Sequence, residues 1–207
     1  MQNVLVINSS ISGGKSVSRL LVDEVVAQLT RHDPTAKIVE RDLGRQPVPH
    51  LTTDTLAAVQ GVPGTEVEQQ ARALSDHLIA ELREANTIVI GAPMYNFSIP
   101  TGLRAWFDHV LRSGETFSYS AAGLEGLLGG RRVVVVESRG GLYSEGPGQA
   151  ADFQEPYLRQ MLAFVGITDI TFIHAEKIGF GPEARAEAIE SAKARIAELV
   201  MPQSRAA

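Results

Sequence analysis

Cysteine is absent from this 207-residue sequence. Its absence excludes a disulfide framework, a thiolate metal or iron–sulfur site, and a cysteine nucleophile. If the chain carries out redox chemistry, a bound cofactor therefore has to supply the electron transfer.

Positive charge is also scarce, since 19 Lys and Arg residues stand against 24 Asp and Glu residues, for a net charge of −5. No stripe of basic residues indicates binding to nucleic acid. No apolar run reaches the roughly 18 residues of a membrane-spanning helix, and the N-terminus MQNVLVINSS has no basic signal-peptide region. We therefore expect a cytoplasmic protein that binds neither nucleic acid nor membrane.

Short apolar runs alternate with segments of helical periodicity along the whole chain. The first run, Val4-Leu5-Val6-Ile7, is rich in β-branched residues, and after it apolar residues recur every four positions from Val17 to Leu29. Further strands are predicted at 37–42, 87–92, 132–138 and 170–174, and further helices around 67–82, 103–111, 157–165 and 189–199.

Five strands of this kind predict a single α/β domain over residues 1–207. Strands that are apolar on both faces form parallel sheets covered by helices on both sides. Right-handed crossovers then give a doubly wound, flavodoxin-like sheet of order 2-1-3-4-5, a fold that binds flavin mononucleotide (FMN) where the strand order reverses.

Residues 43–64 form a long, Pro-containing connection that does not fit this alternation. A short helix is predicted inside it, at residues 53–60. The segment is either a surface excursion or a lid or oligomer contact.

Ligands bind at the carboxyl ends of the strands in such sheets, so the loops at residues 9–18, 93–100 and 138–147 are the candidate site. In the first loop, Ser10, Ser16 and Ser18 bring hydroxyl groups to the start of a helix, where free N–H groups and the helix dipole favour a phosphate. The same loop also resembles the phosphate-binding motif G-x-x-x-x-G-K-[ST], with Ser9 in place of the first glycine. A phosphotransferase would use Lys15 and Ser16, with Glu137 as the nearest acidic ligand for magnesium.

The second loop, PMYNFSIP, is suited to a flat heterocycle. Asn96 and backbone amides can bond a polar edge, while Tyr95 and Phe97 cover a face or belong to a core or interface. Trp106 and Phe107, in the helix that follows, favour helix packing.

The third loop contains Ser138-Arg139-Gly140-Gly141. The paired glycines allow close backbone approach, and the Arg139 side chain faces either an anion or solvent. Tyr143 can gate the pocket, although the loop also fits a simple turn. The five histidines are dispersed without metal-ligand spacing, so no metal is predicted, and His109 fits a structural role inside a helix.

Taken together, these segments resemble the family of FMN-dependent NADH-azoreductases, also described as NADH:quinone oxidoreductases. The resemblance runs in order through nearly the whole chain. It is carried by VLVINSSI, LSDHLIAEL, APMYNF, IPTGLRAWFD, SRGG, FVGITDITFIHAE and the pair Gly181-Pro182.

The resemblance implies a flavin enzyme in which NADH or NADPH reduces FMN and leaves, and a quinone or azo compound then takes the hydride. The flavin carries the chemistry, so no catalytic side chain is implied. It further implies a homodimer with active sites at the interface, whose substrate space is lined by Phe117, Tyr143, Met161 and Phe164. A non-enzymatic FMN-binding electron carrier is a further alternative. The implied cofactor-binding residues are Ser10, Ser16, Val17 and Ser18 at the phosphate, and Met94, Tyr95, Asn96, Phe97, Ser138, Arg139, Gly140 and Gly141 around the flavin ring.

Overall fold

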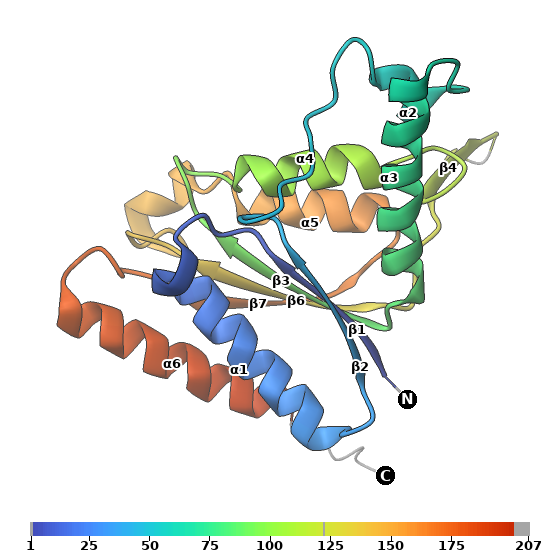
Figure 1. Cartoon of the computed structure of the whole chain (residues 1–207). Helices are drawn as coiled ribbons and strands as arrows, with labels where there is room; N and C mark the ends of the chain where they lie inside the picture. The colour runs from blue at the N-terminus through green and yellow to red at the C-terminus, as the bar shows by residue number, and fades with distance from the viewer. Residues whose placement is uncertain (1, 122, 201–207) are drawn as a thin grey trace.

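The computed structural model describes residues 2–121 and 123–200, and its central element is a five-stranded parallel sheet (Figure 1). The order β2-β1-β3-β6-β7 is the predicted flavodoxin-like order, because β6 and β7 are the fourth and fifth strands of this sheet. Residues 201–207 of the predicted domain lie outside the described residues. The strands are β1 (Asn3–Asn8), β2 (Lys37–Asp42), β3 (Thr87–Pro93), β6 (Arg132–Ser138) and β7 (Asp169–Ala175).

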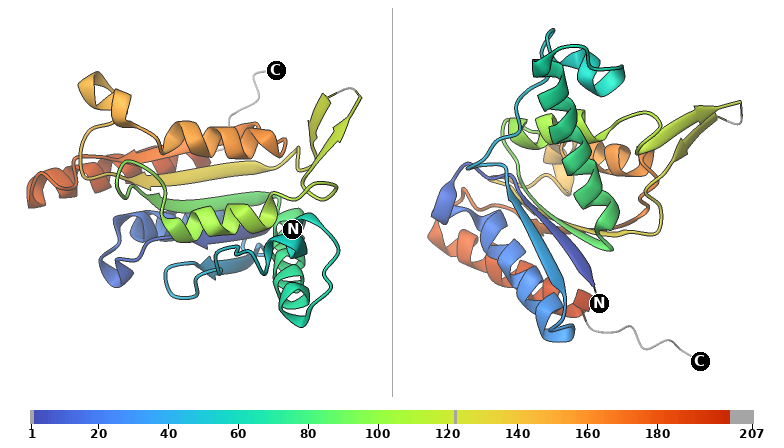
Figure 2. Two further views of the ribbon diagram at one scale, coloured as in Figure 1. Left: turned by 90° about the horizontal axis from the view of Figure 1, so that it is seen from above. Right: turned by 45° about the vertical axis from the view of Figure 1, so that its right-hand side comes forward.

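Helices cover both faces of the sheet, as predicted (Figures 1 and 2). One face carries α1 (Val17–His32) and α6 (Pro182–Val200). The other carries α3 (Glu66–Glu84), α4 (Thr101–Val110) and α5 (Glu155–Phe164). Across the described part of the chain, no helix combines the length and apolar character needed to span a membrane.

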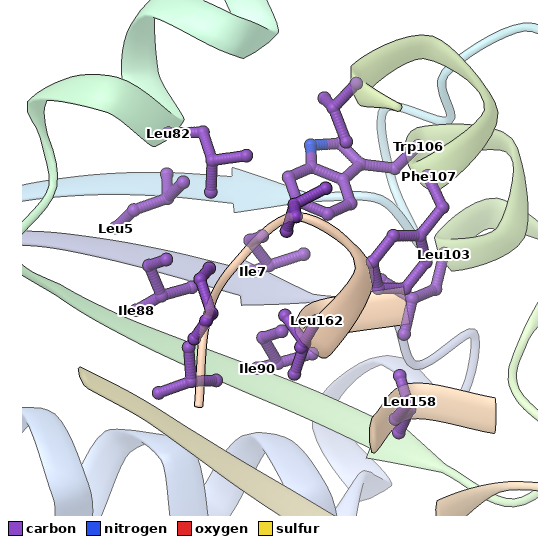
Figure 3. Packing of buried hydrophobic residues seen from close by; sticks show 14 of the residues in the cluster. Leu5, Ile7, Leu82, Ile88, Ile90, Leu103, Trp106, Phe107, Leu158 and Leu162 are labelled. Atoms are coloured by element: carbon purple, nitrogen blue, oxygen red, sulfur yellow. The ribbon is translucent and has the colours of Figure 1, made fainter. Parts of the chain in front are cut away.

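Each face of the sheet has its own hydrophobic core. Trp106 and Phe107 of α4 are both 2% exposed, with ring centroids 5.1 Å apart, and they point toward Ile7 and Ile90 of the sheet (Figure 3). Their role is therefore helix packing, as the sequence favours. Of the aromatic residues next to the candidate site, Tyr95 and Phe97 are in the loop that precedes this helix, and Tyr143 is in the third loop.

The expectation that all five strands are apolar on both faces is wrong for β2. This edge strand has the sequence KIVERD, and none of its residues is fully buried. An edge strand exposes unpaired backbone groups, and charged side chains there discourage pairing with another sheet. Only the inner strands β1, β3 and β6 are long buried runs.

The connection at 43–64 contains one short helix, α2 (Leu56–Gln60), which begins three residues later than the predicted helix at 53–60. Ala58 and Val59 are buried, and Arg72 of α3 donates to the carbonyl oxygen of Ala58 at 2.5 Å. The excursion is thus anchored on α3. Its role as a lid or oligomer contact stays a prediction.

A two-stranded antiparallel hairpin, β4 (Phe117–Ser120) and β5 (Gly123–Gly126), was not predicted. It projects from the edge of the sheet where the strands begin, at the end opposite the candidate loops (Figure 2). Gly126 packs directly on Gly166, because a Cβ atom on Gly126 would lie 2.1 Å from the Gly166 nitrogen.

Candidate functional site

The three candidate loops meet at the carboxyl edge of the sheet. The Tyr95 hydroxyl lies 3.2 Å from the Ile11 nitrogen and 3.4 Å from Ser10 Oγ, which joins the second loop to the first. The Met94 nitrogen donates to the Ser138 carbonyl oxygen at 2.9 Å and joins the second loop to the third. The loops therefore form one continuous surface, as the parallel topology requires.

The first loop leads into α1 through a short 3-10 turn, Gly13–Lys15. Ser16 is the N-cap of α1, and its Oγ accepts from the Arg19 nitrogen at 3.1 Å and lies 3.1 Å from Ser18 Oγ. Val17 packs its side chain into the core, so its backbone N–H is the group it can offer. Hydroxyls next to the free N–H groups of a first helical turn suit a phosphate dianion.

The phosphotransferase alternative required Glu137 as an acidic ligand for magnesium, and the structure places this residue elsewhere. Glu137 is completely buried, and its Oε2 atom lies 2.5 Å from Arg139 Nη2. A carboxylate held in this way is not available to a magnesium ion at the first loop. The hydroxyl and N–H donors that remain fit a phosphate monoester.

The second loop contains a strained two-residue turn. Tyr95 and Ser98 exchange backbone hydrogen bonds of 3.0 and 3.1 Å, and the residues between them, Asn96 and Phe97, have φ angles of 49° and 69°. This is the pattern of a type I′ turn, which favours Asn followed by Gly. Phenylalanine at positive φ is strained, and such strain concentrates at functional sites.

The turn with positive φ angles places the Phe97 ring at the surface. The Phe97 side chain is half exposed, and its ring meets the Tyr143 ring edge-on with centroids 6.1 Å apart. The predicted gating residue Tyr143 therefore lies beside the second loop. Next to it, a Cβ atom on Gly140 would meet no atom within 4 Å, so this backbone is open to a ligand.

Arg139 requires a correction. The prediction that its side chain faces the anion of a bound ligand or solvent is wrong, because the side chain is 0% exposed and its guanidinium is paired with carboxylates of the protein. The guanidinium points into the protein, where Nη2 pairs with Glu137 and Nη1 lies 3.2 Å from Glu176 Oε1. Arg139 can contribute to a ligand site only through its backbone.

A charge cluster with Arg139 and Glu137 completely buried at its centre thus lies beneath the third loop, and sequence reasoning singled out Glu137 but missed Glu155, His174 and Glu176. His174 Nε2 lies 2.8 Å from Glu155 Oε2 and 3.1 Å from Glu137 Oε2. These hydrogen bonds raise the pKa of His174 to about 9 and lower the pKa of Glu155 to about 2. Burial raises the pKa of Glu137.

One atom from each of Glu137, Glu155 and His174 falls within 4.8 Å of the others, a spacing that could hold a metal ion. In this structure, the positive charge beside the carboxylates of Glu137 and Glu155 comes from the Arg139 guanidinium and the protonated imidazole of His174. The absence of a metal stays a prediction. The only sequence signal for the cluster was an acidic residue at the end of the valine run of β6.

The residues predicted to line the substrate space are divided between the two edges of the sheet. Phe117 of the hairpin packs on Phe164 at the end of α5, with ring centroids 4.6 Å apart. Met161, one turn earlier on α5, is partly buried against the core. These three residues lie toward the amino edge, whereas Tyr143 lies at the carboxyl edge.

His109 has the structural role that its helical position indicates. Its Nε2 atom lies 3.0 Å from the Pro49 carbonyl oxygen. Burial lowers its pKa.

The sheet order and the polar loops at its carboxyl edge define a flavodoxin-like protein, and a family model described as Flavodoxin-like fold matches residues 2–200. A protein of Hyphomonas neptunium named FMN-dependent NADH:quinone oxidoreductase is 67% identical over 199 residues, which are 96% of each chain. A Haemophilus influenzae protein of the same name is 46% identical over 200 residues, 97% of this chain and 98% of its own. The chain belongs to the family of FMN-dependent NADH:quinone oxidoreductases.

Solved structures agree with this family. An azoreductase of Bacillus anthracis superimposes with a TM-score of 0.88 at 29% identity and covers 97% of this chain and 99% of its own. An FMN-dependent NADH-azoreductase of the same species, solved in complex with FMN, has a TM-score of 0.83 at 26% identity and covers 97% and 100% of the two chains.

Proposed function

We propose that this chain is an FMN-dependent oxidoreductase that takes a hydride from NADH or NADPH and reduces quinones and azo compounds. The observation that carries the proposal is the continuous surface of the three loops, where a strained aromatic turn lies beside buried hydroxyls and an open glycine backbone. The family relationship supplies the chemistry that fits this surface.

The phosphate of FMN would be held by dipoles in place of a basic patch. Ser10, Ser16 and Ser18 are buried hydroxyl residues near the start of α1, and Val17 adds its backbone N–H. The dipole of a 16-residue helix adds favourable potential at this end. This arrangement suits a protein whose net charge is −5.

The flavin ring would lie between the second and third loops. Met94, Tyr95, Asn96 and Phe97 would border one side, where the Asn96 amide can bond the polar edge of the ring and the exposed Phe97 ring can cover a face. Ser138, Gly140, Gly141 and the backbone of Arg139 would border the other side.

When bound, FMN would supply the redox chemistry in two half-reactions, from NADH or NADPH and then to the quinone or azo acceptor. The chain's own work is to position the reactants and exclude water.

We further propose a homodimer whose second copy completes each active site. Within one chain, Phe117 is in the hairpin strand β4, which projects at the amino edge (Figure 2), and Met161 and Phe164 are in the last turn of α5, where Phe164 packs on Phe117. Exposed apolar side chains accompany them on and after the hairpin, with Tyr119 67% and Leu124 46% exposed. A partner chain that buries this surface could bring its own Phe117 to the open side of the loops.

A visible spectrum tests the enzyme directly. Protein saturated with FMN should lose its flavin absorbance when NADH is added without oxygen, and should oxidise NADH steadily with benzoquinone or an azo dye. Parallel lines in double-reciprocal plots would support alternating binding of donor and acceptor. Protein that neither retains nor rebinds FMN would contradict the proposal.

The same assays separate the alternatives. An electron carrier would bind FMN without sustained NADH oxidation. A phosphotransferase would bind nucleotide with magnesium and lose that binding in Lys15→Ala.

The placement of the flavin ring is tested by two asparagines at opposite ends of β3. Asn96→Ala should weaken FMN binding about tenfold, the expected effect of one lost hydrogen bond to a polar ligand. Asn86 is exposed, and its Oδ1 accepts from the Asn3 nitrogen at 3.1 Å at the other edge. Asn86→Ala should leave FMN binding unchanged, and equal effects in both variants would refute the placement.

A further inference from the structure

Arg139 is a residue of a ligand-facing loop whose side chain is turned completely inward. Its Nε atom donates to Gln154 Oε1 at 3.1 Å, and its Nη1 atom donates to Glu176 Oε1 at 3.2 Å. Its Nη2 atom lies 2.5 Å from Glu137 Oε2 and 3.1 Å from Asp152 Oδ2. The partners come from the end of β6, the segment before α5 and the segment after β7, so one guanidinium joins three parts of the chain.

On the third loop, the network continues from these partners to the backbone. Glu176 Oε1, which accepts from Arg139, also accepts from the backbone nitrogens of Tyr143 at 2.8 Å and Ser144 at 3.0 Å. Its Oε2 atom accepts from the Ser144 hydroxyl at 2.5 Å. Backbone hydrogen bonds to residues 175–179 hold residues 139–141 as well, so the contacts to Glu176 are the ones that fix the next part of the loop, at Tyr143 and Ser144.

The second loop is tied to the same network. Gln154 Nε2 donates to the Ala92 carbonyl oxygen at 2.8 Å, just before the loop begins. The neighbouring Phe153 nitrogen donates to the carbonyl oxygen of Phe97, the strained residue, at 3.1 Å. Both loops proposed to border the flavin ring are thus hydrogen-bonded to residues that also bind the Arg139 guanidinium: the third loop to Glu176, and the strand end before the second loop to Gln154.

The composition of the cluster argues against a role in stability alone. Four carboxylates, from Glu137, Asp152, Glu155 and Glu176, face the two cations Arg139 and His174. The buried Glu137 Oε1 atom has no hydrogen-bond partner among the described residues. Replacing buried ion pairs by apolar residues of similar volume is often neutral or stabilising, so net stability does not by itself account for the cluster.

We propose that Arg139 is a positioning residue, whose buried guanidinium holds residues 93–98 and 138–144 in the geometry that receives the flavin ring before the cofactor binds. The proposal rests on the proposed function only for the identity of that cofactor. Preorganisation of this kind improves affinity because the loops lose little conformational freedom on binding.

The planar fork of the guanidinium is essential to this role. It donates in three directions at once, from Nε, Nη1 and Nη2. A lysine ammonium keeps the charge but cannot reproduce this fixed fork. Arg139→Lys therefore separates geometry from charge.

The test compares Arg139→Lys and Glu176→Gln with Arg112→Lys. Arg112 is the other buried arginine among the described residues, and it donates to Ser75 Oγ at 2.8 Å near the opposite edge of the sheet. Amide hydrogen exchange in the cofactor-free protein should accelerate about tenfold or more at Tyr143 and Ser144 in the first two variants and stay unchanged there in Arg112→Lys. The dissociation constant for FMN should rise about tenfold or more in the same two variants only.

If the folded Arg139→Lys variant shows unchanged rates of amide hydrogen exchange at Tyr143 and Ser144, the proposal is overturned. An equal loss of FMN affinity in Arg112→Lys would also overturn it, because general destabilisation would then explain the effect. If Arg139→Lys does not fold, Glu176→Gln decides, since it leaves the contacts of Arg139 with Glu137 and Gln154 in place. If the wild-type protein binds no FMN, the proposed function fails, while the exchange result still judges the role of Arg139 in the loops.

Discussion

Among the residues that the structure describes, each of the two edges of the sheet contains one buried arginine, and the two arginines have different partners. At the amino edge, Arg112 donates to Ser75 Oγ at 2.8 Å and pairs with Asp76, while Ser75 donates to the His109 carbonyl oxygen at 2.7 Å. These contacts close the end of α4 against α3. At the carboxyl edge, the partners of Arg139 lead to the backbone of two open loops.

Backbone strain also differs between the amino and carboxyl edges of the sheet. Among the described residues, the non-glycine residues with positive φ are Asn96, Phe97 and Lys177, and all three follow the carboxyl ends of strands. At the amino edge, the contacts of Arg112 join the end of α4 to α3, whereas the carboxyl edge combines positive φ angles in its loops with the cluster of charged residues around Arg139. The comparison indicates that the carboxyl edge is built to hold a particular loop geometry, and that the amino edge is built to close the fold.

The largest expected effect comes from filling the close backbone contact at each edge. A Cβ atom on Gly44 would lie 2.1 Å from the Ser10 carbonyl oxygen, and one on Gly126 would lie 2.1 Å from the Gly166 nitrogen. Each alanine substitution should lower the free energy of unfolding by about 2–3 kcal/mol, because backbone has to move in both cases. Urea denaturation measures this effect.

FMN titration then distinguishes the two edges. Gly44→Ala should weaken FMN binding because it displaces the loop that contains Ser10, whereas Gly126→Ala should displace only the hairpin. The distinction between the edges would fail if both variants lost the same affinity for FMN.

A smaller, pH-dependent effect is expected from His174→Gln. The pKa of His174 is raised from 6.5 to about 9 by Glu137 and Glu155, against the opposing influence of burial and Arg139. A raised pKa means that the protonated imidazole stabilises the fold fully below pH 6.5 and that this stabilisation is lost as the pH rises through 9. The pKa of Glu155 is lowered from 4.5 to about 2, so its contribution is present above pH 4.5 and lost as the pH falls toward 2.

The wild type should therefore exceed His174→Gln in stability most between about pH 5 and 6, by on the order of 1–3 kcal/mol, and least above about pH 9. Urea denaturation at several pH values checks the profile. His77→Gln is the matched control, because its surface pair with Glu81 is expected to contribute less than about 1 kcal/mol. A pH-independent difference in His174→Gln would show that its ion pairs are not the source of stability.

The smallest expected effect has the opposite sign. Phe97→Gly should raise the free energy of unfolding by about 0.5–1 kcal/mol, because glycine removes the strain at the second turn position and little buried surface is lost. FMN affinity should fall at the same time, since the exposed ring is gone. Tyr119→Gly in the hairpin, which removes an exposed aromatic residue without positive φ, should lower stability instead. Loss of stability in Phe97→Gly would mean that the turn is not strained.

The inner strands β1, β3 and β6 were predictable because a buried parallel strand has to be a continuous apolar run, whereas β2 was placed correctly although none of its residues is fully buried. The predicted strand limits differ from the observed ones by at most one residue. The hairpin was missed because its strands are short and mostly exposed: FSYS alternates over four residues only, and GLEG does not alternate. The strain at Phe97 was also hidden, since a φ angle depends on the hydrogen bonds between Tyr95 and Ser98.

The sequence by itself determined the layered fold and the three loops that meet at one edge, because apolar periodicity and parallel topology are properties of the order of residues along the chain. Only the tertiary structure decided where the Arg139 side chain points. Its partners lie between 2 and 37 positions away along the chain, and no local pattern links them. They meet because β6, β7 and α5 pack side by side, and a buried guanidinium is stable only where such packing brings several acceptors to one point.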